Sequence, residues 1–472
     1  MHTSAHSKTD LTIRSGSKIA IIGAGPAGSF FAHFAHRYAA DKDIKIDIVL
    51  FDGKDFTTYG PKGCNLCAGV ISETLLDRLI SCGIALPKEK VQRRITGYNI
   101  IGKAGEIHLT NPKGGGRITT VYRGNGPRRS SLEENVSFDD YLLENVRKKG
   151  IRIINSPVRE IVLPSDLRNP ITIIYGTGAD RSAFEADLAV GAFGLNPSMT
   201  KYIQELDFGY IPPKTVRAWN MEIRADEYLG NRDNKNSIRS YNLSDRRGIS
   251  VINIVPKKEY VTVNMIGKKD VRKRDFDRVM SRLVYDHRIP KEWREYSELC
   301  SCSPKVVTSS ARTPYTDRLV LIGDASCSRY YKNGIESALI TAKYAAKAVF
   351  ELGISNRMLR KGYYRRIKRS IVRDNLYGRI LVVINDIVTG NFFLSKIMNE
   401  IARPGSYYGA GLFLRDVLWN MYTGNTSYKR IFISILNPVQ QTKVIIGAAR
   451  AILRNGYRSY TDNRMKLSRT NS

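Results

Sequence analysis

Cysteine and histidine are scarce in this chain of 472 residues, which contains six of each. Six cysteines are too few for a disulfide-based scaffold, so the sequence predicts a protein of a reducing compartment. The histidines follow no metal-ligand pattern, and we predict no metal site from them. No apolar run reaches about 18 residues, and the polar first residues lack the apolar core of a signal peptide. We therefore expect a cytoplasmic protein without a spanning helix, whose membrane contact, if any, is made from one side.

Acidic residues are also in short supply: 44 Asp and Glu stand against 75 Lys and Arg, for a formal net charge of +31. This balance favours anionic partners, such as a phospholipid surface, a phosphorylated substrate or a nucleic acid. Residues 357–379 hold nine basic residues and one acid, Asp374. Aromatic residues among these cations suit a helix at an anionic membrane surface, so we predict peripheral membrane association. A solvated basic face without a partner is the alternative, and nucleic acid is disfavoured because no RNA-binding motif accompanies the charge.

The chain opens on a strand–glycine–helix pattern. The apolar run KIAII (18–22) suits a buried parallel strand, and GAGPAG (23–28) follows at once, before a helical pattern. In such a loop the glycines allow a tight turn, the approach of a pyrophosphate and close packing of helix on strand. The next strand ends on Asp52, where an acid is expected to bind ribose hydroxyls. The pattern predicts a dinucleotide site formed by Asp52 and by the loop residues Gly23, Ala24, Gly25, Pro26, Ala27 and Gly28.

The order of predicted strands and helices indicates an α/β fold with an insertion. Buried strands are predicted at 151–155, 171–175, 186–194 and 318–326, and a long helical pattern follows Gly334. The stretch 217–267 includes alternating segments that suit an antiparallel sheet. We predict a flexible tail (1–17), a discontinuous Rossmann-like domain (18–205 and 304–355), an inserted antiparallel β-sheet substrate domain (206–303) and a basic helical C-terminal region (356–472).

The end of the Rossmann-like domain carries a second cofactor motif. LVLIGDAS (319–326) followed by YYKNGIESALITAKYAA (330–346) resembles the second FAD motif of the large flavoprotein family that includes aromatic hydroxylases and geranylgeranyl reductases. DLAVGAFGLNPS (187–198) resembles that family's middle motif, with Phe193 in place of the usual acid. SFDDYLLENVRKKGIRIINSPV (137–158) resembles a third segment, which assigns Arg123 and Val158 to FAD, with Arg128 or Arg129 as alternatives to the first. The resemblance implies an FAD-binding domain and adds these cofactor contacts: Gly323, Asp324, Lys332, Asn333, Gly334 and Ile335.

Two cysteines lie among glycines in GPKGCNLCAGVIS (60–72). CAGVIS (67–72) resembles the CGGxIS motif of the geranylgeranyl reductase branch, which places Cys67 and Ala68 beside the flavin and makes Cys67 the candidate catalytic residue. Three alternatives stay open for the cysteines. They are a zinc site of Cys64 and Cys67 with Cys300 and Cys302, a CxxC redox disulfide that exchanges electrons with flavin, and small buried residues of a glycine-rich loop.

The resemblance implies reduction of a C=C bond by hydride transfer from reduced FAD. The second carbon needs a proton, which Cys67 can donate or help to position. The substrate implied is an isoprenoid (geranylgeranyl-type) lipid or a quinone. In SVINIVPKK (250–258), however, Asn253 and Val255 replace the aromatic residues usual in that branch.

The electron donor is open, because no second GxGxxG accompanies the first. A ferredoxin-like carrier and transiently docking NAD(P)H are both compatible with the sequence. The alternative functions are a flavin-dependent monooxygenase and an electron-transfer flavoprotein that uses the CxxC pair.

Overall fold

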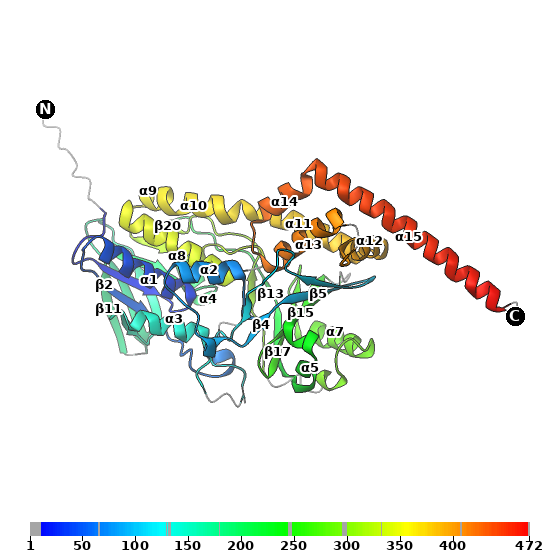
Figure 1. Ribbon diagram of the computed structural model, residues 1–472. Helices are drawn as coiled ribbons and strands as arrows, with labels where there is room; N and C mark the ends of the chain where they lie inside the picture. The colour runs from blue at the N-terminus through cyan, green and yellow to red at the C-terminus, as the bar shows by residue number, and fades with distance from the viewer. Residues whose placement is uncertain are drawn as a thin grey trace.

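The computed structural model (Figure 1) describes residues 11–64, 67–128, 130, 134–178, 180–243, 248–294, 300–331, 333–405 and 408–470. Two large sheets form two lobes, and C-terminal helices pack against both lobes. The predicted α/β class, with a Rossmann-like sheet, an antiparallel sheet and a helical C-terminal region, is confirmed.

The Rossmann-like sheet has six strands, in the order β20 (Tyr315–Thr316), β21 (Leu319–Leu321), β12 (Leu188–Gly191), β1 (Lys18–Ile22), β2 (Asp47–Phe51) and β8 (Arg152–Ile154). All neighbours run parallel except β20 and β21. The strands are apolar on both faces because both faces are covered. One face packs on α1 (Pro26–Asp41), α3 (Phe138–Arg147) and α8 (Gly334–Glu351). The other face packs on α4 (Pro197–Glu205) and on the sheet of β9 (Val158–Val162), β10 (Ile171–Thr177) and β11 (Asp180–Ala186).

The second large sheet has seven strands, in the order β18 (Ser301–Cys302), β14 (Trp219–Arg224), β17 (Tyr260–Gly267), β16 (Ile249–Pro256), β15 (Ser237–Asn242), β5 (Gly97–Gly102) and β6 (Gly105–Thr110). Its neighbours are antiparallel except β15 and β5. One face packs on α7 (Lys273–Tyr285), with α5 (Asp226–Gly230) and α6 (Arg232–Asn236) at its end. Between the lobes lie the short sheet of β3 (Val70–Ile71), β7 (Ile118–Thr120) and β4 (Arg93–Ile95), and the ribbon of β13 (Thr215–Arg217) and β19 (Lys305–Val307). The helix α2 (Glu73–Ser81) packs in the core of the Rossmann-like lobe.

Two predicted domain boundaries are wrong. Residues 97–110 were assigned to the FAD-binding domain, but β5 and β6 extend the substrate sheet, because β5 pairs with a strand about 140 residues later in the chain. A flexible tail was predicted over 1–17, but its residues 11–17 pack against the Rossmann-like lobe. Leu11 is buried and accepts a hydrogen bond from Ile354 N at 2.7 Å. Residues 1–10 lie outside the described part of the chain.

The C-terminal region is helical throughout its described residues, as predicted. It starts with α9 (Asn356–Leu359), which the π-helical turn Arg360–Tyr364 joins to α10 (Arg365–Ile367), and a second π-helical turn, Lys368–Val372, leads from α10 to the next helix. It continues with α11 (Asp374–Gly390), α12 (Phe392–Ala402), α13 (Tyr408–Thr423), α14 (Tyr428–Leu436) and α15 (Pro438–Thr470), the last of which extends away from the body of the molecule (Figure 1). Tyr363 fixes this region to the Rossmann-like lobe: it is fully buried, and its hydroxyl donates to Leu321 O at 2.7 Å.

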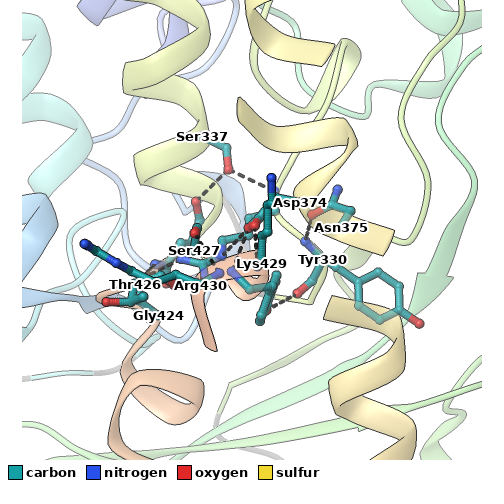
Figure 2. Close-up of polar contacts among 12 residues, drawn as sticks. Tyr330, Ser337, Asp374, Asn375, Gly424, Thr426, Ser427, Lys429 and Arg430 are labelled. Carbon is teal, nitrogen blue, oxygen red and sulfur yellow. Dashed lines mark hydrogen bonds and ion pairs between the residues drawn. The ribbon is translucent and has the colours of Figure 1, made fainter. Parts of the chain in front are cut away.

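A polar cluster attaches α11 and α14 to the segment that carries the second cofactor motif (Figure 2). Its centre is Asp374, the one acid in the basic stretch 357–379. Its carboxylate accepts from the N–H groups of Tyr428 and Lys429 at 2.9 and 2.8 Å, at the first turn of α14. Arg329 donates to the carbonyls of Gly424 and Thr426 and stacks 4.2 Å from the centroid of the Tyr428 ring. The acid is therefore a capping residue, because carboxylates stabilise helix N-termini.

Candidate active site

A cleft with a volume of about 880 Å³ lies between the two large sheets. Its walls come from the glycine loop after β1, the end of β2, the segment after β12, the segment after β21 and the edge of the substrate sheet. In parallel sheets, ligands bind beyond the carboxyl ends of the strands, and the cleft occupies that position. Fourteen of the predicted site residues line it: Gly23, Gly25, Pro26, Ala27, Asp52, Cys67, Ala68, Arg123, Val158, Gly323, Asp324, Asn333, Gly334 and Ile335.

The glycine loop leaves no room for side chains. Gly23 has a φ of +106°, and a Cβ built there would lie 2.5 Å from Ala192 O. A Cβ on Gly28 would lie 1.9 Å from Gly23 O, so a glycine is needed for α1 to start this close to the strand. Ala24 and Gly28 do not line the cleft; they are buried beneath the loop and support it. The free N–H groups at the start of α1 lie beside the cleft, where they favour an anion.

Asp52 is tied to the same loop. Its Oδ2 accepts from Ala24 N at 2.6 Å, and its Oδ1 accepts from Lys54 N at 2.9 Å. Burial raises the pKa of Asp52, and the two N–H donors partly offset that effect. A carboxylate has about four acceptor positions, so these two bonds leave capacity for hydroxyl donors in the cleft.

The second motif brings another helix N-terminus to the cleft. Gly323 has a φ of +62° and begins a short turn that places Asp324 in the wall. Burial raises the pKa of Asp324, offset in part by a hydrogen bond from Ser328 and by the charge of Arg123. Asn333 adopts a left-handed conformation before α8, whose first residues line the cleft. Lys332 lies outside the described residues, so its predicted contact stays a prediction.

Arg123 is the arginine that reaches the cleft. It is buried, and its guanidinium donates from Nε and Nη2 to the two oxygens of Asp139 at 2.5 and 2.9 Å. Burial alone would lower the pKa of Arg123, but the carboxylate of Asp139 raises it above its ordinary value. The alternative Arg128 does not line the cleft and instead lies against Gly60, while Arg129 is outside the described residues. Val158, at the start of β9, lines the far end of the cleft.

Three other residues of the motif around Cys67 have a structural role. Gly69 has a φ of +72°, and a Cβ there would lie 1.9 Å from Val121 O. Ile71 is fully buried, and Ser72 caps α2 by accepting from Leu75 N at 3.3 Å. Cys67 Sγ accepts a hydrogen bond from Gly69 N at 3.4 Å and faces the cleft. The loop therefore holds one thiol at the cleft wall.

A second, small cavity of about 30 Å³ lies behind Cys67; we call it the thiol pocket. Cys67 and Asn220 line both the cleft and the thiol pocket, so they form the partition between them. Residues 64, 67, 300 and 302, all cysteines, meet at this pocket from two segments remote in sequence. None of the six cysteines is in a disulfide, and no three His, Cys, Asp or Glu side chains in the described ranges are grouped to hold a metal ion. Burial raises the pKa of the Cys300 and Cys302 thiols.

Two buried polar atoms of the residues that line the thiol pocket, Tyr122 Oη and Glu222 Oε2, have no hydrogen-bond partner in the described part of the chain. Burial raises the pKa of Tyr122 well above its ordinary value, and the nearby charge of Glu222 adds to the effect. The Glu222 carboxylate is held by Lys257, whose Nζ lies 3.1 Å from Oε1 and 4.1 Å from the centroid of the Tyr122 ring. Thr262 also donates to Glu222 Oε1, at 2.7 Å. This ion pair is almost fully enclosed.

The substrate sheet presents a polar row toward the cleft. Asn220, Asn264 and Asn253 lie opposite one another on β14, β17 and β16, and are joined by amide hydrogen bonds of 2.5 and 3.4 Å. Asn253, which the sequence already marked as a departure, thus bonds within the sheet. Arg217 and Lys305 are directly opposite in the β13–β19 ribbon, and both line the cleft. Like charges opposite each other are destabilising, so this end of the cleft favours an anionic ligand.

Sequence reasoning missed several cleft residues. Arg329 directly precedes the stretch 330–346 of the second motif and Tyr331 lies within it, and their place in the sequence is the only sign that they line the cleft. Asn220, Asn264 and the charged pair of the β13–β19 ribbon come from strands whose pairing partners are distant in the chain. Tyr122, adjacent to Arg123, gave no signal of its own.

The residues fit an FAD molecule. The cleft falls within the size range of cofactor pockets, roughly 300–1,000 Å³. Two helix N-termini and the buried Arg123 supply donors and positive charge for a pyrophosphate, and the glycine loop permits close approach. Asp52 and Asp324 supply acceptors for hydroxyl groups at opposite walls.

The sequence and fold have known relatives. No family model matches the chain. A geranylgeranyl diphosphate reductase of Synechocystis sp. is 26% identical over 200 residues, which are 41% of this chain and 42% of that protein, so the match spans less than half of the curated relative. A geranylgeranyl bacteriochlorophyll reductase-like protein of Thermoplasma acidophilum has a TM-score of 0.61 at 16% identity, over 93% of this chain and 100% of the other. CmlS, a flavin-dependent halogenase, has a TM-score of 0.59 at 17% identity, over 89% of this chain and 77% of the halogenase.

At these identities the solved structures establish the fold: an α/β flavoprotein fold with an antiparallel substrate sheet. Together with the sequence similarity over 41% of the chain, the fold makes this chain similar to the geranylgeranyl reductase-like FAD-dependent oxidoreductases. The family resemblance predicted from the motifs is confirmed.

Proposed function

We propose that this protein binds FAD in the cleft and reduces C=C bonds of an isoprenoid lipid or quinone. The observation that carries the proposal is the place of Cys67, on the partition between a cofactor-sized cleft and a small polar pocket. The named activity of the curated relatives, reduction of geranylgeranyl diphosphate, supports the choice of an isoprenoid. The cationic pair Arg217 and Lys305 supports a substrate that carries an anionic group.

In this account the glycine loop, the start of α8 and Arg123 hold the cofactor, which when bound supplies a hydride for one alkene carbon. Cys67 holds or positions the proton for the other carbon. Asp139 keeps Arg123 oriented through its two hydrogen bonds. The substrate sheet closes the cleft on the opposite side and excludes water from the reacting carbons.

The thiol pocket is suited to resupply this proton. Its volume of about 30 Å³ exceeds the roughly 10–15 Å³ that a water molecule needs. Tyr122 Oη and Glu222 Oε2 are buried polar atoms that such a water would satisfy, one as a donor and one as an acceptor. A tyrosine with the ordinary pKa of about 10 is protonated at neutral pH, and burial raises the pKa of Tyr122 further, so its hydroxyl is a donor.

The test uses purified, FAD-loaded protein that is chemically reduced without oxygen and mixed with geranylgeranyl diphosphate or a geranylgeranylated phospholipid. We expect products heavier by one or more hydrogen molecules. Cys67→Ala is expected to retain FAD and lose most turnover. Cys82→Ala is the matched control, because Cys82 is buried but lines neither the cleft nor the thiol pocket. Oxygen uptake with NADPH and an oxygenated product would instead indicate the monooxygenase alternative.

One observation favours a second candidate, an electron-transfer flavoprotein. Four cysteines line the thiol pocket, which is the arrangement that dithiol chemistry needs. The raised pKa values of Cys300 and Cys302 oppose it, because the thiolate is the reactive form. Anaerobic mixing of FAD-loaded protein with a dithiol decides between the electron-transfer function and the reduction of C=C bonds. Flavin reduction that depends on Cys64 and Cys67 supports the electron-transfer function.

A further inference from the structure

Large hydrophobic side chains are exposed mainly on one part of the molecule. Of the 21 in the described chain, 15 lie on α11, α12, α14 and α15. Monomeric soluble proteins rarely expose large contiguous apolar areas, so this concentration calls for a partner. We call these residues the apolar platform: Leu376, Ile380, Val383, Ile384, Ile387, Phe392, Phe393, Leu394, Ile433, Leu436, Val439, Ile445, Ile446, Ile452 and Leu453.

The platform residues lie on neighbouring helices that contact one another. On α11 its members recur at helical spacing, from Leu376 to Ile387, while the opposite face of that helix is buried. The four helices pack on one another (Figure 1), and the rings of Tyr377 and Phe432 meet at 5.4 Å between α11 and α14. A bend of 99° after α11 leaves Phe392 and Phe393 at an exposed elbow.

Charge identifies the kind of partner. The acids in residues 375–454 are each paired with a cation: Asp386 with Lys268, Glu400 with Arg403 and Asp416 with Lys113. Glu400 is buried, and Asp386 and Asp416 are half-buried. By contrast, exposed cations surround the platform: Arg379, Lys396, Arg403, Lys429, Arg430, Lys443, Arg450 and Arg454.

We infer that the apolar platform and its surrounding cations dock on an anionic lipid surface. Apolar side chains enter the acyl boundary while Lys and Arg contact the head groups. A second copy of this chain fits less well, because facing platforms would bring the exposed cations together without acids to pair them. The inference stands independently of the reaction proposed above.

This surface is not the one predicted from the basic stretch. Between 357 and 373 no large apolar side chain is exposed: Tyr363, Ile367 and Ile371 are buried, and the exposed residues are the cations and Ser370. The amphipathic face predicted there is therefore buried against the Rossmann-like lobe. No single helix in the described ranges is long and apolar enough to span a bilayer, although α9 to α11 and α12 qualify together as a bent pair.

The platform is rigidly joined to the cleft. Asp374 at the start of α11 caps α14 (Figure 2). Arg329, which contacts the loop before α14, also lines the cleft. Docking would therefore hold the cleft at a fixed position relative to the lipid surface.

The experiment is vesicle sedimentation of the full-length, FAD-loaded protein. Vesicles of phosphatidylcholine mixed with phosphatidylglycerol are compared with phosphatidylcholine alone. We expect binding to the mixed vesicles that weakens with salt, and a loss of at least about tenfold for Phe392→Asp combined with Phe393→Asp. Lys443→Gln combined with Arg450→Gln is expected to weaken binding about 25-fold, near fivefold for each cation. Tyr285→Asp is the matched control, because Tyr285 is 83% exposed on α7, in the other lobe.

A second measurement does not depend on loss of binding. The tryptophan introduced by Phe393→Trp is expected to shift its fluorescence emission to the blue when mixed vesicles are added. The tryptophan introduced by Tyr285→Trp is expected to show no shift. Failure to bind either vesicle, equal loss in Tyr285→Asp, or no shift at position 393 would overturn the inference. Conversion of a dimer to a monomer by the Phe392 and Phe393 changes, without vesicle binding, would assign the platform to a second copy and overturn it also.

Discussion

Replacing Lys257 by methionine tests the buried charge network behind the candidate thiol. Lys257 is 1% exposed, and its Nζ contacts Glu222 Oε1 at 3.1 Å and Thr262 Oγ1 at 2.5 Å. Methionine keeps most of the volume but leaves the Glu222 carboxylate enclosed with only the Thr262 hydroxyl. Breaking a buried ion pair on one side costs about 3–5 kcal/mol, so we expect the free energy of unfolding of the substrate domain to fall by that amount.

Urea unfolding followed by tryptophan fluorescence measures this change, because Trp293 lies in the core of the same sheet and Trp219 packs against it. Lys347→Met is the control, since Lys347 pairs with Glu351 at 3.5 Å on an exposed helix face and should cost less than about 1 kcal/mol. Adding Glu222→Gln to Lys257→Met should recover much of the loss, because the uncompensated charge is removed. A loss below about 1 kcal/mol for Lys257→Met, or no recovery in the double variant, would refute the reasoning.

Three further predictions concern the cleft. Gly28→Ala should abolish FAD retention on purification, because its Cβ would lie 1.9 Å from a backbone oxygen, whereas Gly230→Ala, with nothing within 4 Å, should retain it. Arg123→Met should lower the free energy of unfolding by about 3–5 kcal/mol and FAD affinity by more than tenfold, since it removes the buried cation that is paired with the fully buried Asp139 carboxylate. Arg152→Met, at an exposed pair, should change both quantities little, and equal effects of the two variants would contradict the assignment. Because burial raises the pKa of Asp324, the folded cofactor-free protein holds that proton more tightly than the unfolded chain. Its stability relative to Asp324→Asn should therefore be greatest below the ordinary Asp pKa and fall as the pH rises through the raised value, as urea titrations across pH would show; an increase would contradict it.

The Rossmann-like half was predictable because its signals are local. A strand, a glycine loop and a helix follow one another within residues 18–41, and Gly323, Asp324 and Asn333 are close together after one strand. The residues that these signals single out line one cleft, although the signals contain nothing about the substrate sheet. The prediction of Arg123 left Arg128 and Arg129 as alternatives. The ion pair with Asp139, which holds Arg123 in place, cannot be deduced from the spacing of the sequence.

The substrate half was less predictable because its contacts are not local. The pairing of β5 with β15 and the meeting of Cys67 with Cys302 join segments far apart in sequence. Sequence reasoning grouped the four cysteines only as zinc ligands, one of three alternatives, whereas the structure shows them as walls of a pocket that also contains Tyr122 and Glu222. The residue types were visible, but their arrangement depends on the sheet register.

The membrane prediction shows the same difference. A cluster of cations in 357–379 is visible in the sequence, but whether apolar neighbours face solvent depends on what covers them. Tyr363 is buried against the Rossmann-like lobe, whereas Phe392 and Phe393, after the bend, are uncovered. Charge density is visible in the sequence, whereas the apolar surface inferred above depends on which side chains the fold leaves uncovered.

The most direct test of the central claim is the mass of isoprenoid lipids and quinones from cells that express the protein, compared with cells that express Cys67→Ala. We predict new species heavier by one or more hydrogen molecules with the unmutated protein and none with the variant, while both proteins retain FAD. If both FAD-loaded proteins yield unchanged lipids in cells that supply geranylgeranyl lipids and reductant, reduction of C=C bonds is not the function of this cleft.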